Sequence, residues 1–129
     1  MASYQVPPTQ LRIQVGNDTW LDAQEVSGDT GPFYVVTSDN PFSERYDEGV
    51  NEMRRVAFRA ALTRRGLEFS EAVGRDIEGT WPDEKGVALR GVSRDVARGV
   101  ARGWDQFAFY EVDSESVTVR AVASNDVLV

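Results

Sequence analysis

The sequence predicts a single α+β domain, a two-layer sandwich in which two helices pack on one face of a mostly antiparallel sheet. Its 129 residues are 41% hydrophobic and 27% charged, which suits one core of ordinary domain size. The local patterns follow the order β-β-β-α-β-β-α-β-β, so pairs of strands separate the two helices. Because short hairpin links join antiparallel neighbours, this order favours an antiparallel sheet.

The N-terminal third combines an irregular start with three strand patterns. Residues 1–9 are polar and aperiodic, so we expect an extended arm there and the α+β domain over residues 10–129. Alternation of apolar and polar residues indicates a strand with one buried face, and a continuous apolar run indicates a central strand covered on both sides. In order, we expect a strand over Gln10–Val15, a turn at 16–18, a short apolar segment from Trp20, a loop over 27–32, a central strand over Phe33–Thr37 and a stop at 38–41.

The longest helix candidate spans Ser43–Arg65 and is followed by Gly66, a residue suited to end a helix. Its acidic residues come first and its arginines last, which complements the helix dipole. At 100° per residue one side is apolar and is expected to face the core, and Arg54 at the border should be less exposed than Arg55 or Arg59. The expected buried side holds Val50, Met53, Val56, Ala57, Ala60 and Ala61, and the opposite side holds Glu48, Glu52, Arg55 and Arg59.

The C-terminal half alternates strands with a second helix. Ser93 precedes Arg94 and Asp95 in the manner of an N-cap. Alternating aromatic and β-branched residues predict a terminal hairpin in which Phe109, like Val35 in the central strand, belongs to the core. We expect a strand from Leu67 to Gly74, a loop over 79–86, a strand at 87–89, a helix from Ser93 to Gly103 that buries Val92, Val96, Val100 and Trp104, and a hairpin of 106–112 with 116–122.

The composition excludes several classes of function. A net charge of -7 opposes a nucleic-acid partner, and the lack of cysteine and histidine excludes disulfides, thiol nucleophiles, imidazole bases and the usual zinc sites. The N-terminus has no secretory signal and no run approaches about 20 apolar residues, so we expect a cytoplasmic protein without a membrane partner. Thirteen arginines against the single Lys85 indicate a GC-rich coding sequence, from a high-GC bacterium or a virus infecting one, with a salt-adapted host as the alternative.

A group of polar residues suggests a binding site. Thr37 ends the central strand, Asn40 follows in the turn, and Asn51 and Arg54 are neighbours on one helix face. The end of a central strand and a facing helix commonly form a ligand crevice. We therefore expect these residues, with Gln106, to bind an anionic or polar ligand through the planar donors of Arg54. Alternatively, Asn40 caps the turn, Asn51 bonds the loop and Arg54 pairs with an acidic neighbour.

Two other segments carry weaker signals. The loop Thr80–Lys85 holds Asp83 and Glu84, which suit an acid and base pair or a hard cation. Adjacent acids in a proline-containing loop are usually only solvated, and the ligand spacing of a metal loop is missing, so we expect no metal and no cofactor. Phe107 and Phe109 imitate a strand that stacks on RNA bases, but such aromatics are more often core residues and the charge opposes RNA.

Four segments together resemble a known family. They are Val35–Pro41, the pair Asn51 and Arg54, Gly79–Trp81 and Ala101–Val112. They are similar to the bacterial and phage family called domain of unknown function 3293, over roughly residues 33–122. In that family an Ile-Thr-Ala-Trp-Asn-Pro-like segment precedes a helix with an Asn-x-x-Arg core, and a Gly-Gln motif opens the penultimate strand. Asp39 replaces the aromatic and Asp105 the glycine here. The resemblance implies a fold unit and no particular activity.

Three functions remain open. The first is a non-catalytic binding or regulatory module for a protein partner or small anionic ligand, encoded by a phage or mobile element. A non-catalytic role fits the lack of activated nucleophiles. The second is an enzyme that acts on an anionic or amide-bearing substrate through the Asn and Arg side chains and a carboxylate such as Glu84, whose pKa must then be raised. The third is a structural subunit of a larger assembly, including a homo-oligomer.

Overall fold

The computed structural model describes residues 10–15, 19–24, 31–80, 82–113, 116–124 and 127–128. The expected N-terminal arm, the turn at 16–18 and most of the loop over 27–32 lie outside the described residues. Within the described ranges the chain forms a 3-10 turn, two helices and seven strands in one sheet. In chain order these are β1 (Gln10–Val15), β2 (Thr19–Gln24), β3 (Phe33–Thr37), η1 (Pro41–Ser43), α1 (Glu48–Arg64), β4 (Glu68–Asp76), β5 (Glu84–Arg90), α2 (Arg94–Gly103), β6 (Ala108–Asp113) and β7 (Ser116–Ala121).

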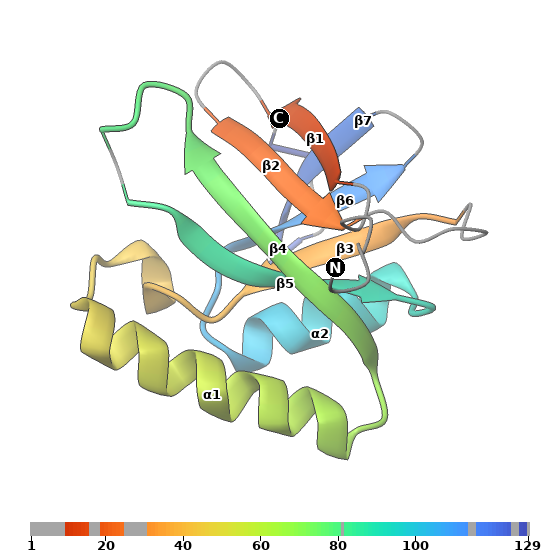
Figure 1. The fold of residues 1–129 in the computed structure, drawn as a ribbon. Coiled ribbons are helices and arrows are strands. Elements are labelled where there is room, and N and C mark those ends of the chain that lie inside the picture. Colours follow the sequence, from red (N-terminus) through yellow and green to blue (C-terminus); the bar gives the residue numbers. More distant parts are fainter. Residues whose placement is uncertain are drawn as a thin grey trace, which may run out of the picture.

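The middle of the chain forms a compact unit that carries both helices. The sheet order is β1-β2-β4-β5-β3-β6-β7, and each ladder is antiparallel. β3 and β4 therefore run in the same direction on either side of β5, with α1 connecting them, and α2 connects β5 to β6 across β3. This is the β-α-β-β-α-β connectivity of ferredoxin-like units. Both helices lie on one face of the sheet, so the prediction of an α+β fold with an antiparallel sheet is confirmed (Figure 1).

The two-layer sandwich is not confirmed, because the second face of the sheet is covered by the sheet itself. One apolar core, which includes Val36 of β3, lies between the sheet and the helices. On the opposite face the outer strands curl toward each other, and β1 contacts β7 (Figure 1). A second core that includes Val35, Ala88 and Val112 fills this near-barrel. β3 is apolar on both faces, so a sheet with helices on one side must curl to bury the other.

The first helix begins later than predicted. The side chain of Asp47 accepts a hydrogen bond from the backbone N–H of Val50 at 2.9 Å, so Asp47 is the N-cap, and Pro41–Ser43 form a separate 3-10 turn. The predicted buried face is wrong. Met53 is 74% exposed and Val56 63% exposed. The buried residues of α1 are Asn51, Arg55, Phe58 and Leu62.

The reason is the surface against which α1 packs. Its N-terminal half bonds the polar turn after β3, through Asn51 to Asn40 and through Arg55 to Asp39. Phe58 and Leu62, in the following turns of the helix, reach the apolar core. The expectation for Arg54 is wrong against Arg55, whose side chain is 5% exposed, and holds narrowly against Arg59, since the exposed fractions are 22% for Arg54 and 25% for Arg59.

The C-terminal half agrees more closely with the sequence pattern. Ser93 is the N-cap of α2, where its hydroxyl accepts from the backbone N–H of Val96 at 3.2 Å. The buried stripe of α2 differs, because Ala97 and Ala101 join Val100 while the other expected residues are only partly buried. The β6–β7 hairpin and the burial of Val35 and Phe109 are confirmed. The loop expected over 79–86 is shorter, since β5 already begins at Glu84.

Candidate functional site

The structure brings the five predicted site residues together at the end of β3. We call Thr37, Asn40, Asn51, Arg54 and Gln106 the turn cluster. The two amide side chains bond each other: Asn51 Oδ1 accepts from the backbone N–H of Asn40 at 2.9 Å, and Asn51 Nδ2 donates to Asn40 Oδ1 at 3.0 Å. The backbone N–H of Tyr46 also donates to Asn40 Oδ1. The side chain of Asn51 on α1 therefore fixes the turn that follows β3.

The other three members bond backbone atoms. Arg54 donates through Nε to the carbonyl of Ser38 at 2.7 Å and through Nη2 to that of Trp104 at 2.8 Å. Gln106 Nε2 donates to the carbonyl of Asp39 at 3.0 Å. The Thr37 hydroxyl donates to the carbonyl of Lys85 at 2.7 Å and accepts from the backbone N–H of Asp39. These bonds join the turn after β3 to β5 and to the segment before β6.

Backbone strain is concentrated in the same place. Among the described residues, the non-glycine residues with positive φ are Asn40 at 49°, Phe42 at 56° and Asp105 at 64°. The backbone N–H of Phe42 donates to the carbonyl of Asp105 at 2.6 Å, so two of the strained positions touch. Asparagine and aspartate tolerate this conformation better than phenylalanine does. The positive φ at Asp105 also explains the glycine that the resembled family has at this position, because glycine adopts a positive φ without strain. Strain of this kind clusters at functional sites.

Sequence reasoning missed the buried ion pair behind the turn cluster. Asp39 and Arg55 are both buried, and they form two parallel bonds, Nε to Oδ1 at 2.9 Å and Nη2 to Oδ2 at 3.0 Å. Arg55 Nη1 also donates to Glu48 at 2.7 Å and to Glu52 at 2.8 Å. One feature of the sequence could have indicated that Arg55 is buried: it shares a helix face with the large apolar Phe58, three residues later.

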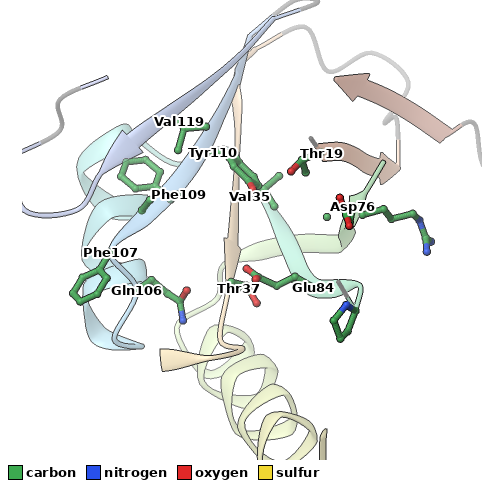
Figure 2. Close-up of a pocket in the computed structure, with 15 residues that line it drawn as sticks. Thr19, Val35, Thr37, Asp76, Glu84, Gln106, Phe107, Phe109, Tyr110 and Val119 are labelled. Atoms are coloured by element: carbon green, nitrogen blue, oxygen red, sulfur yellow. The ribbon is translucent and has the colours of Figure 1, made fainter. Parts of the chain in front are cut away.

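Two pockets open beside the turn cluster and share Pro82, Glu84 and Gln106. The mouth pocket, of about 330 Å³, enters the open end of the near-barrel. Figure 2 shows Thr37 between Gln106 and Glu84 at its rim. Its deeper lining is apolar and includes Val35, Tyr110 and Val119, which belong to or pack against the core of the near-barrel. This pocket offers an apolar wall below a polar rim.

The helix-side pocket, of about 580 Å³, lies over the start of α1. Asn40 and Asn51 of the turn cluster line it, whereas Arg54 lines neither pocket. Its charged lining is mainly acidic: the carboxylates are Asp39, Asp47, Glu48, Asp83 and Glu84, and the cation is Arg45. The helix-side pocket therefore has a negative field that the mouth pocket shares through Glu84.

The turn cluster and Glu84 lie inside a region that matches a known family. The family model described as "Protein of unknown function (DUF3293)" matches residues 36–109, more than half of the chain. The chain belongs to the DUF3293 family. The DUF3293 region contains the whole turn cluster, both helices and Glu84, so the resemblance in the sequence is confirmed. No curated protein and no solved structure matches the chain.

Within the DUF3293 region, Glu84 is the most perturbed acid. Surrounding protein atoms remove part of the hydration of the Glu84 carboxylate and raise its pKa to about 7. The nearby negative charge of Asp39 adds to this increase. Across the described residues, no hydrogen bond or ion pair reaches its carboxylate. Glu84 as a whole is nevertheless an exposed residue, so water reaches it through the open pockets. Glu84 is thus an accessible carboxylate that titrates near neutral pH.

This pKa predicts how Glu84→Gln changes the pH dependence of stability. The pKa in the folded state lies above the ordinary value of 4.5, so the folded protein holds a proton that the unfolded chain releases between these two values. The contribution of Glu84 is therefore most favourable below pH 4.5 and is lost as the pH rises to about 7. Thermal unfolding at several pH values should show that Glu84→Gln melts above the wild type at pH 8, with the difference vanishing near pH 4. An equal difference at both pH values would contradict the raised pKa.

Two kinds of feature are not found among the described residues. No group of three His, Cys, Asp or Glu side chains within it is arranged to hold a metal ion. Neither described helix has the length and apolar character needed to span a membrane.

Proposed function

We propose that this protein is a small non-catalytic binding module whose ligand occupies the junction of the two pockets. The volumes of the pockets fall in the range typical of small-molecule sites. The observation that carries the proposal is the placement of Glu84, an unpaired carboxylate lining both pockets, next to an apolar wall. A ligand that fits has an apolar group for the mouth pocket and a polar group beside Glu84.

The charges favour a cationic ligand over the anionic ligand predicted from the turn cluster. Five carboxylates line the helix-side pocket against Arg45 as the cation. Arg54 and Arg55 direct their donors to the protein itself, to the carbonyl of Ser38 and the carboxylate of Asp39. An anion beside Glu84 would meet repulsion from the ionised Glu84 and from Asp39, whose charge already raises the pKa of Glu84, whereas an ammonium group would be attracted. A regulatory role and a phage origin remain predictions from composition.

Benzylammonium is a suitable probe because it joins an aromatic ring to an ammonium group. We expect calorimetric titration to detect binding at pH 8, with affinity reduced about tenfold or more at pH 5.5, where Glu84 holds its proton. Benzyl alcohol and benzoate, of similar shape, should bind more weakly than benzylammonium at pH 8. Amide shifts in a nuclear magnetic resonance spectrum should move around Thr37, Glu84 and Gln106.

Two variants give the matched comparison. Glu84→Gln should remove the pH dependence and most of the binding, whereas Glu68→Gln, a change at an exposed acid at the start of β4, should leave both unchanged. The proposal fails if benzoate binds better than benzylammonium, or if Glu84→Gln binds as the wild type does.

An enzyme is the second candidate, because Glu84 supplies the proton carrier with a raised pKa that this function requires. Incubation with N-benzylacetamide separates the two. Release of benzylamine by the wild type, lost in Glu84→Gln, would support amide hydrolysis. Binding without turnover supports the binding module.

A further inference from the structure

An apolar strip runs along the outer side of α1, which lies at the edge of the molecule (Figure 1). We define the α1 strip as Val50, Met53, Ala57 and Ala60, with Val56 beside it. All five residues are exposed, and Met53 and Val56 are among the most exposed large apolar side chains of the described chain. Single exposed apolar residues are ordinary, but a continuous row on one helix face marks an interaction surface.

The spacing of the α1 strip is that of a helix-to-helix seam. Val50, Met53, Ala57 and Ala60 are separated by three, four and three residues. Alternation of three and four is the a/d pattern of helices that pack side by side. The two alanines are small, so a second helix can approach closely at that point. The strip therefore fits another helix better than it fits an extended peptide.

The charges of α1 indicate which helix this is. Glu44 and Asp47 stand at its N-terminal end, and Arg64 and Arg65 at its C-terminal end. Within the described residues neither of these two arginines has an ion-pair partner. In an antiparallel pair of α1 helices, each basic end would lie beside the acidic end of the other copy, and the helix dipoles would also be opposed. A parallel pair would place like charges together.

We propose that a second copy of this chain covers the α1 strip, with the two α1 helices antiparallel and crossing near Ala57. The strip and the turn cluster lie on different sides of α1, since Asn51 and Arg55 are buried where Met53 is exposed. A dimer formed in this way leaves the mouth pocket open, since no residue of α1 lines it. This inference is independent of the proposed ligand.

The first test measures the mass of the protein by light scattering and sedimentation over a range of concentrations. The wild type should approach the mass of a dimer as concentration rises, and Met53→Lys with Ala57→Lys should stay monomeric with an unchanged circular dichroism spectrum. Val127→Lys, which changes another exposed apolar residue, should dimerise as the wild type does. A monomeric wild type at about 1 mM, or a dimer that survives the double change, would overturn the proposal.

The second test maps the contact and its direction without relying on the lysine variants. The chain has no cysteine, so a single introduced cysteine reports one position. Under mild oxidation Ala57→Cys should form a disulfide-linked dimer, because position 57 lies at the crossing. Val50→Cys should give at least tenfold less disulfide-linked dimer. In an antiparallel pair that crosses at position 57, the two cysteines at position 50 are about 21 Å apart along the helix axis, at ~1.5 Å per residue, which is beyond the reach of a disulfide. Equal cross-linking at both positions, or none at Ala57→Cys, would contradict the antiparallel dimer.

Discussion

Replacement of Arg55 by methionine is expected to lower the free energy of unfolding by about 3–5 kcal/mol. The guanidinium forms two parallel bonds to Asp39, and both side chains are buried. Methionine fills much of the same volume but leaves the Asp39 carboxylate without its cation inside the protein. Urea unfolding at pH 7 measures the loss.

Arg59, one turn further along α1, provides the control. It also forms an ion pair, with Glu71, but Glu71 is exposed, so Arg59→Met should cost less than about 1 kcal/mol. A further comparison removes both buried charges at once. Arg55→Met combined with Asp39→Leu should be more stable than Arg55→Met alone, because no charge is then left unpaired in the interior. Equal losses for Arg55→Met and Arg59→Met would contradict the importance of burial.

Replacement of Phe109 by alanine is expected to cost about 3–5 kcal/mol, since it removes a buried aromatic ring and leaves a cavity. Phe109 is 2% exposed and lies in the core between the sheet and the helices. Its ring packs against that of Tyr34, with centroids 6.3 Å apart. A thermal unfolding curve should show a clearly lower melting temperature.

Phe107 is the matched control because it lies two residues earlier on the same segment. It is 57% exposed and contacts the exposed ring of Phe42. Phe107→Ala should therefore cost less than about 1 kcal/mol. If Phe107→Ala destabilised the protein as much as Phe109→Ala, the assignment of the core at the start of β6 would be wrong.

Local patterns identified most strands because each depends on neighbours close in the sequence. The predicted bounds of β1 and β3 agree with the structure, and the Ser93 cap is confirmed because its hydrogen bond reaches only to Val96. The start of β5 at Glu84 could not be predicted in this way. Its strand forms because it pairs with Gly74 of β4, ten residues away, and no local pattern reports that pairing.

The candidate site was predicted in part. The turn cluster was identified by residue type and position, and the structure does bring its members together. What these residues bond was not predictable, because the partners of Arg54 are backbone carbonyls of Ser38 and Trp104, sixteen and fifty residues away. Glu84 was named only as a possible proton carrier or cation ligand. Its raised pKa depends on the pocket walls and on Asp39, which only the fold places beside it.

The sequence by itself determined the number and order of the described strands and α-helices, the acidic character of the chain, the lack of thiol and imidazole chemistry, and the family. The tertiary structure decided that the sheet curls into a near-barrel and that α1 buries Asn51 and Arg55 while it exposes Met53. Periodicity assumes that an apolar face turns inward, which holds when the surface opposite is apolar. The start of α1 instead meets a polar turn, and paired polar groups are the stable neighbours of such a surface.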